Sequence, residues 1–334
     1  MRIQLITPAP PGTQHGNRVT ALRWARILRE LGHHVRLAQS YQDEPVDLLV
    51  ALHAKRSYPA IRSFSRFYPD RPLIVALTGT DVYRDLRKSR RAQTSLELAT
   101  RLIVLQPQAL DEIHPRLRGK VSVIFQSARA ATRKFPRPLA ANNGRSFDVC
   151  VVGHLRFVKD PFRAALAARL LPPQSRIRIL HFGAALSPEM ASFARAEMQR
   201  NARYNWRGER PKRKVQQILA RSRLCVLSSK LEGGANVLSE AVVNRVPILA
   251  SRIPGSIGIL GEDYPGYFRV GDTKELAQLL QCAENDSAFL RLLRSRCARC
   301  LPLFHPAREK VAWRNLLNEL RVPQRPRPSD DRCS

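Results

Sequence analysis

Short, continuous apolar runs recur along most of the chain, and each is followed by a turn and an amphipathic stretch. Continuous runs, unlike alternating ones, are typical of strands covered by helices on both faces. The strand–helix–strand order therefore predicts parallel, doubly wound sheets. The first strands are expected at residues 3–7, 34–38, 47–52, 73–77, 102–105 and 121–125. A helix expected at about residues 20–31 stops at Gly32, a usual position for a helix-ending glycine.

The pattern lapses in a polar, proline-containing stretch, residues 131–146, which is typical of an interdomain linker. A second series then begins. Its strands are expected at residues 149–152, 177–182, 224–227 and 247–250. Its helices are expected near residues 160–171, 188–200, 212–220, 235–244 and 273–283.

A chain of 334 residues has room for about two domains of roughly 150 residues each. We therefore predict an α/β protein with two Rossmann-like, doubly wound parallel-sheet domains facing a cleft. The predicted domains span residues 1–130 and 147–304, and they are followed by a helix at residues 305–321. Residues 322–334, rich in Pro, Arg and Asp, are expected to be a disordered tail.

The charge of the chain raises the alternative of a nucleic-acid-binding protein. The formal net charge is +30, with 57 Lys and Arg against 27 Asp and Glu. Clustered cations would neutralise phosphates, but here arginines are spread from Arg2 to Arg332. We therefore favour solvated helix faces, and we expect non-specific attraction of anions at low salt but no specific nucleic-acid partner.

No apolar run approaches the ~20 residues that cross a bilayer, and the start of the chain does not resemble a signal peptide, so we predict a cytoplasmic protein. The six cysteines are scattered, and disulfides are not expected. Cys297 and Cys300 form one C-x-x-C, with only Cys282 and His305 nearby. Without a second pair at zinc-site spacing, a metal or redox role is not favoured.

Ligands of open α/β sheets bind beyond the carboxyl ends of the strands, so the residues just after each strand are candidates. The loop at residues 8–18 precedes a helix and contains Gly16, where backbone amides can approach an anion. An ordinary connecting loop is an equal alternative there. The loop at residues 153–161 carries Arg156 and Lys159, two cations that suit a diphosphate leaving group unless they are only solvated charges.

A third candidate segment runs from Glu232 to Glu240 after an expected strand. Gly233 and Gly234 open a helix whose free amides would face the crevice. Two carboxylates thus bracket an anion-binding helix end, one able to meet a sugar and the other a ribose. This placement is more specific than a chance pair of glutamates.

The segments at residues 153–159, 232–240 and 247–255 together resemble retaining glycosyltransferases of the GT-B class, in the glycogen-synthase-like family four. The resemblance implies that Glu240 binds the donor ribose and Glu232 the transferred sugar. It implies that Arg156, Lys159 and the amides near Asn236 and Val237 bind the diphosphate, and that the last helix crosses back onto the first domain. The other donor-binding residues expected on this basis are Gly16, Asn17, Gly153, Arg207, Gly233, Gly234 and Ala235.

A narrower resemblance rests on residues 16–24, 52–57, 78–83 and 153–156, which are similar to the selenosugar synthases of selenoneine biosynthesis. It implies transfer of a sugar from UDP-N-acetylglucosamine or UDP-glucose to selenophosphate, with formation of a C–Se bond. His154 stands where the wider family usually has an arginine, and Arg156 follows two residues later. Which residue of this loop binds the diphosphate is therefore left open.

A small, highly charged acceptor needs cations, and several basic residues follow strands of the first domain. The acceptor-binding residues expected are Arg18, His53, Lys55, Arg56, Thr78 and Asp81. Asp81 could orient a hydroxyl or cap a helix. No D-x-D motif appears in the body of the chain, so neither a metal nor a cofactor is expected. A cell-envelope or lipid hydroxyl acceptor and a sugar-nucleotide epimerase remain alternatives, and the oligomeric state is open.

Overall fold

The computed structural model describes residues 1–131 and 146–320, which form two α/β halves. We call residues 1–131 the N-terminal half and residues 146–304 the C-terminal half. Each half contains one six-stranded sheet, and all the strand pairings are parallel. The predicted fold class, two doubly wound parallel sheets with helices, is confirmed. The linker predicted at residues 131–146 lies almost wholly outside the described residues, and the tail predicted at residues 322–334 lies wholly outside them.

The N-terminal sheet has the strand order β2-β1-β3-β4-β5-β6. Its strands are β1 (Arg2–Ile6), β2 (His34–Ala38), β3 (Leu48–Leu52), β4 (Leu73–Leu77), β5 (Arg101–Val104) and β6 (Val121–Val123). Its helices are α1 (Gly16–Glu30), α2 (Tyr58–Phe67), α3 (Leu86–Lys88), α4 (Arg90–Leu98) and α5 (Pro115–Arg118). Helix α1 ends as predicted, because Gly32 has a φ of +86° and its amide bonds back to the carbonyl of Arg29.

The C-terminal sheet has the order β12-β11-β10-β7-β8-β9. Its strands are β7 (Phe147–Val152), β8 (Ile177–Phe182), β9 (Tyr204–Trp206), β10 (Leu224–Leu227), β11 (Ile248–Ser251) and β12 (Tyr267–Phe268). Its helices are α6 (Arg163–Arg169), α7 (Pro188–Arg200), α8 (Lys212–Arg221), α9 (Asn236–Val243), α10 (Pro254–Leu260), α11 (Thr273–Asn285) and α12 (Ser287–Arg299). The sequence analysis missed β9 and β12. Both are short edge strands, which need few pairings and leave no apolar run.

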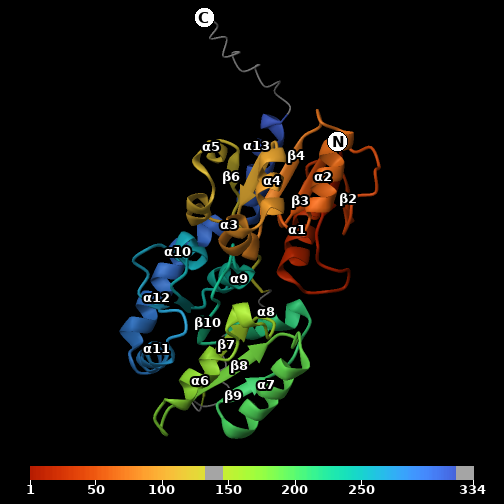
Figure 1. The fold of residues 1–334 in the computed structure, drawn as a ribbon. Coiled ribbons are helices and arrows are strands. Elements are labelled where there is room, and N and C mark those ends of the chain that lie inside the picture. Colours follow the sequence, from red (N-terminus) through yellow and green to blue (C-terminus); the bar gives the residue numbers. More distant parts are fainter. Residues whose placement is uncertain (132–145, 321–334) are drawn as a thin grey trace, which may run out of the picture.

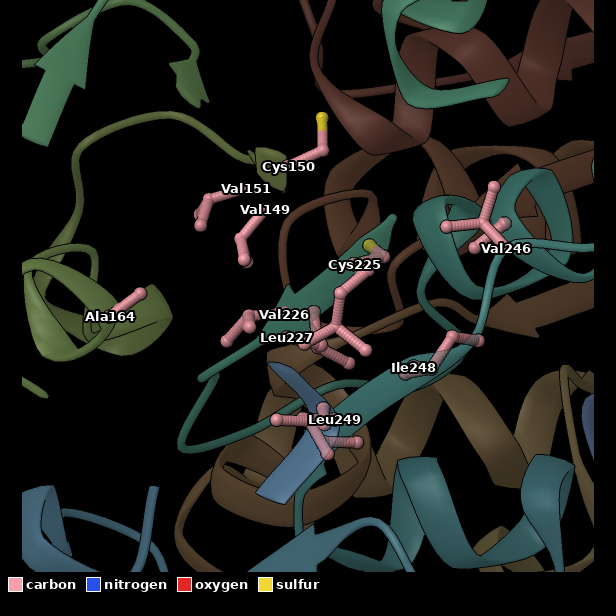
Figure 2. Packing of buried hydrophobic residues seen from close by; sticks show 14 of the residues in the cluster. Val149, Cys150, Val151, Ala164, Cys225, Val226, Leu227, Val246, Ile248 and Leu249 are labelled. Carbon is pink, nitrogen blue, oxygen red and sulfur yellow. The ribbon is translucent and has the colours of Figure 1, made fainter. Parts of the chain in front are cut away.

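The apolar runs form the cores. All five residues of β3 and of β4 are buried, with helices on both sides of the sheet. In the C-terminal half, Val149 and Val151 extend from one side of β7 and Cys150 from the other (Figure 2). Burial raises the pKa of the Cys150 thiol to about 12 and that of Cys297 to about 11, so both thiols are protonated core groups.

The last helix, α13 (Pro306–Glu319), returns to the N-terminal half (Figure 1). Trp313, Leu316 and Leu317 join the core beneath β1 and β3, and the Trp313 ring meets Trp24 of α1 edge-on at 5.0 Å. No helix among the described residues is long and apolar enough to span a membrane. The cytoplasmic location stays a prediction.

Candidate active site

A cavity of about 360 Å³ lies between the two halves. It is lined by the loops that follow β1, β3 and β4 on one side and β7, β8 and β10 on the other. Each sheet has a topological switch point, at which the strand order reverses. It lies between β1 and β3 in the N-terminal sheet and between β7 and β10 in the C-terminal sheet. Open α/β sheets bind ligands at such points, beyond the carboxyl ends of the strands. The cavity therefore occupies the expected binding position of both sheets at once.

Most of the predicted site residues line this cavity. The lining residues among them are Gly16, Asn17, His53, Arg56, Thr78, Gly153, Arg156, Lys159, Glu232, Gly234, Ala235, Asn236, Val237 and Glu240. The others lie outside the lining: Arg18, Lys55, Asp81, Arg207 and Gly233.

Glu232 and Glu240 each have a defined cation partner. Glu232 is 9% exposed, accepts a hydrogen bond from Ser229 Oγ at 2.6 Å and pairs with Lys159. Glu240 pairs with Lys212 Nζ at 3.0 Å. Charge-assisted contacts of this kind fix carboxylates in one orientation, so each glutamate presents its remaining oxygen in a set direction.

Helix α9 begins at Asn236, between these two glutamates. The first amides of a helix have no partner within it, and together with the helix dipole they favour an anion. Asn236, Val237 and Ala235 all line the cavity at this end. The C-terminal half therefore presents free amides flanked by two oriented carboxylates.

Arg156 is half-buried in the cavity wall. Burial lowers its pKa; attraction by Glu232 opposes this effect, and repulsion by Arg56 and Arg84 adds to it. The guanidinium remains charged at neutral pH. Among the described residues, neither Arg156 nor Arg56 forms a side-chain ion pair, so no direct carboxylate contact neutralises these two cavity-lining cations.

The N-terminal wall carries buried polar atoms without hydrogen-bond partners. They are His53 Nε2, Thr78 Oγ1 and Gln126 Oε1, and all three residues line the cavity. His53 is 3% exposed and has a φ of +74°, an unusual backbone conformation for histidine. Its Nδ1 accepts the Arg56 amide at 3.3 Å, which leaves Nε2 as the proton-bearing nitrogen. Strained, unsatisfied side chains in a cavity wall are typical of a ligand site.

Residues 133–299, half of the chain, match the family described as glycosyl transferases group 1. The chain belongs to this family. It is therefore an enzyme that transfers glycosyl groups.

Solved structures of similar shape share the fold of this glycosyltransferase. HepE of Anabaena, in complex with UDP-glucose, is 17% identical with a TM-score of 0.76, over 96% of this chain and all of that chain. Sucrose-phosphate synthase of Thermosynechococcus elongatus is 16% identical with a TM-score of 0.73, over 96% and 98%. An E. coli structure described as trehalose-6-phosphate bound with UDP-2-fluoro glucose is 13% identical with a TM-score of 0.70, over 96% and 99%. They confirm the GT-B architecture.

Two predicted acceptor residues of the glycosyltransferase have structural partners instead. Asp81 is fully buried, and its carboxylate accepts backbone amides of Ala54 at 3.1 Å, Thr78 at 3.4 Å and Gly79 at 2.8 Å. It joins the loops after β3 and β4, which corrects both the hydroxyl-orienting and the helix-capping expectations. Lys55 points to Asp85, with Nζ 3.3 Å from Oδ1.

Gly233 and Arg207 also differ from expectation. A Cβ on Gly233 would lie 2.7 Å from the Thr78 carbonyl carbon and from the Gly79 amide nitrogen. Gly233 therefore allows the backbones of the two halves to touch, which no residue with a side chain permits. Arg207 directly follows β9, is exposed and lies outside the cavity lining.

His154 occupies the position at which the wider family usually has arginine. Its Nδ1 accepts the Ala184 amide at 3.1 Å, and its ring lies 5.3 Å from that of His15 in the N-terminal half. Burial lowers the pKa of His154, so the imidazole is neutral at neutral pH. Arg156, two residues later, is the nearby cation that lines the cavity.

The sequence analysis missed Gln126 and Lys212, both in the cavity lining. Gln126 directly follows the strand that the sequence predicts at residues 121–125, and this position is a signal that could have found it. Lys212 was concealed in a run of basic residues at the start of α8. No three His, Cys, Asp or Glu side chains within residues 1–131 and 146–320 form a group that could hold a metal ion. Metal-independent transfer stays a prediction.

Proposed function

We propose that this glycosyltransferase transfers a sugar from UDP-N-acetylglucosamine or UDP-glucose to selenophosphate. The C-terminal half supplies the donor site. The α9 amides, Arg156 and Lys159 offset the charge of the diphosphate, Glu232 orients the sugar, and Glu240 binds the ribose. The similar folds solved with UDP-glucose and UDP-2-fluoro glucose support this choice of donor.

The observation that carries the acceptor proposal is the pair of cations, Arg56 after β3 and Arg156 after β7, that line the cavity from its two sides. The two guanidinium groups repel each other, and His53 and Thr78, whose Nε2 and Oγ1 have no hydrogen-bond partner, line the same cavity. With Arg156 engaged by the donor diphosphate, Arg56 and the two neutral donors remain for the acceptor, and together they suit a small tetrahedral anion.

In the proposed reaction, the selenium atom of selenophosphate attacks the anomeric carbon. A C–Se bond forms, the bond from that carbon to the diphosphate oxygen breaks, and UDP leaves with the bonding electron pair. Attack from the face that UDP leaves retains the configuration, as the resemblance to retaining enzymes implies. Selenophosphate is already anionic, so the step needs no strong general base.

A hydroxyl acceptor of cell-envelope or lipid type is the second candidate. His53 lines the cavity, with Asp85 Oδ2 4.0 Å from its Nε2. Because Nδ1 accepts the Arg56 amide, Nε2 carries the proton, and His53 could take a hydroxyl proton at Nε2 only after its tautomer changes. This candidate therefore predicts that His53 is essential, whereas a selenium nucleophile does not require it as a base.

The test is an anaerobic assay of UDP release and product mass with each UDP-sugar, with and without selenophosphate. We expect selenophosphate-dependent UDP release and a selenium-bearing sugar. Glu232→Gln should reduce the rate at least about 100-fold, as loss of a transition-state contact does. The matched control Glu262→Gln changes an exposed glutamate and should retain activity. UDP release that is indifferent to selenophosphate would refute the acceptor proposal.

A variant pair isolates the acceptor site. Arg56→Ala should raise the KM for selenophosphate about 10-fold, because it removes one charged partner of the anion, while KM for the UDP-sugar stays unchanged. Arg62→Ala, an exposed change on the adjoining helix α2, is the control. Equal KM values for selenophosphate in both variants would contradict the assignment of Arg56.

A further inference from the structure

Arg23 connects the two halves at the donor end of the cavity, although it does not line the cavity. It lies on α1 in the N-terminal half, and its side chain is 10% exposed. Its Nη1 donates to Asn236 Oδ1 at 3.0 Å. Asn236 is the first residue of α9 and lines the cavity. The largely buried guanidinium of Arg23 therefore contacts the first residue of α9, the helix whose initial amides form the anion-binding end.

Arg23 is also held by Glu309 of α13. The Glu309 carboxylate is fully buried and accepts Arg23 Nε at 3.1 Å, Trp24 Nε1 at 2.8 Å and the Ser127 amide at 3.0 Å. The Ser127 hydroxyl is a further partner. A buried carboxylate with this many donors has little freedom, so it fixes the guanidinium rigidly.

Asn236 is also bounded by the start of α1. A Cβ on Gly16 would lie 4.0 Å from Asn236 Nδ2. The side chain of Asn236 thus lies along α1, with Gly16 and Arg23 as neighbours about two turns apart. Its position depends on the N-terminal half and not only on the half that contains α9.

We propose that Arg23 is a positioning residue: anchored by Glu309, it fixes Asn236 so that the α9 amides take their diphosphate-binding orientation when the two halves meet. This inference rests on the donor site of the proposed function. Amides that bind a diphosphate do so most tightly when they are already held in place, because ordering them during binding would cost affinity. The chain segments that make this arrangement, α1, α9 and α13, are far apart in sequence and meet where the two halves pack together.

The variant Arg23→Gln removes the charge-assisted bond to Asn236. We expect a Kd for UDP about 10-fold higher, measured by calorimetry without acceptor, and a matching rise in KM for the UDP-sugar with a smaller change in kcat. The matched control is Lys310→Met, which breaks the Lys310–Glu30 contact between the same helices α13 and α1, 3.4 Å long, without touching Asn236. It should leave the Kd unchanged.

Because Arg23→Gln leaves Glu309 with one partner fewer, a second variant is needed. Asn236→Ala breaks the same contact from the other side and leaves Arg23 and Glu309 paired. The double variant combines Arg23→Gln with Asn236→Ala. If Arg23 acts through Asn236, this double variant should bind UDP no more than about 2-fold more weakly than Asn236→Ala alone. If the two single changes instead raise the Kd for UDP independently, so that the factor in the double variant is the product of the two single factors, the inference is overturned.

Hydrogen exchange in the ligand-free protein tests the inference without relying on UDP. Exchange at residues 236–243 should be faster in Arg23→Gln than in wild type, and it should be unchanged in Lys310→Met. If wild type does not bind UDP but α9 shows this loss of protection, the donor assignment fails and the positioning role stands. If UDP binds and α9 protection is the same in all variants, the positioning role fails.

Discussion

Among the charged residues of the cavity, the two glutamates Glu232 and Glu240 have ion-pair partners and two arginines do not. Glu232 and Glu240 have Lys159 and Lys212, whereas Arg56 and Arg156 have no ion-pair partner within the described chain. Arg156 is half-buried, and a partly buried charge without a partner is costly, so it is expected where a ligand supplies the opposite charge; Arg56 is exposed. The charge imbalance of the cavity is therefore the feature of the side chains that bears most directly on the substrate.

His181 supplies a pH-dependent prediction. It is buried in β8, bonds to Gly153 O and Tyr204 Oη at 3.0 Å each, and burial lowers its pKa to about 4. The unfolded chain binds a proton near pH 6.5 and the folded chain does not, so stability is complete above that pH and falls as the pH drops towards 4. The expected loss is roughly 3 kcal/mol over this window.

Urea unfolding at about pH 7 and about pH 4.5 measures this loss. His181→Gln keeps a polar side chain but does not titrate, so its unfolding free energy should fall less between the two conditions than that of wild type. An equal fall in both proteins would show that His181 is not the responsible group.

Among the elements, the two glycines after β10 and the helix α9 that follows them have different roles. Helix α9 supplies free amides, while Gly233 and Gly234 bring its start against the N-terminal half, where their neighbours are Thr78, Gly79 and Leu105. The same short segment thus forms the anion-binding end and a contact between the halves. This arrangement explains why two residues without side chains precede the helix.

Gly233→Ala should disturb that contact. Its Cβ would meet backbone atoms at 2.7 Å, which cannot move aside as a flexible side chain would. We expect the halves to separate locally and the rate of UDP release to fall at least about 10-fold, because misplaced catalytic groups cost large factors in rate. Gly119→Ala is the control, since its Cβ would meet nothing within 4 Å. Full activity in Gly233→Ala would mean that the close approach is not needed for catalysis.

At the scale of the whole molecule, the two sheets and the returning helix α13 form a single arrangement around one cavity. The net charge of +30 belongs to this scale, because the arginines are spread along the whole chain instead of gathering in one arm. Such a field attracts anions in general and is screened by salt.

We therefore predict weak, non-specific binding to duplex DNA. The Kd should be weaker than about 10⁻⁶ M at physiological salt, and affinity should decrease steeply as salt increases, without preference among sequences. Fluorescence anisotropy at several salt concentrations measures this. Tight, sequence-dependent binding in physiological salt would instead support a nucleic-acid function.

Much of the fold could be read from the sequence because buried strands need continuous apolar residues. The bounds expected for β2, β4, β8 and β10 agree with the structure, and the other runs shift by one or two residues. Edge strands β9 and β12 left no such signal. For the site, the position of residues directly after strands was informative, and it brought Glu232, Glu240, Arg156 and Lys159 to one cavity.

Local apolar patterns and chain order are enough to specify the two doubly wound sheets and the loops that meet at their carboxyl ends. Which polar residue of a loop lines the cavity depends instead on how the folded elements pack. Thr78 lines the cavity while Asp81, three residues later, is buried against backbone amides. Arg23 has no signal in sequence at all, since its partners Asn236 and Glu309 come from distant segments. Such contacts depend on how folded elements pack, and periodicity along the chain carries no information about them.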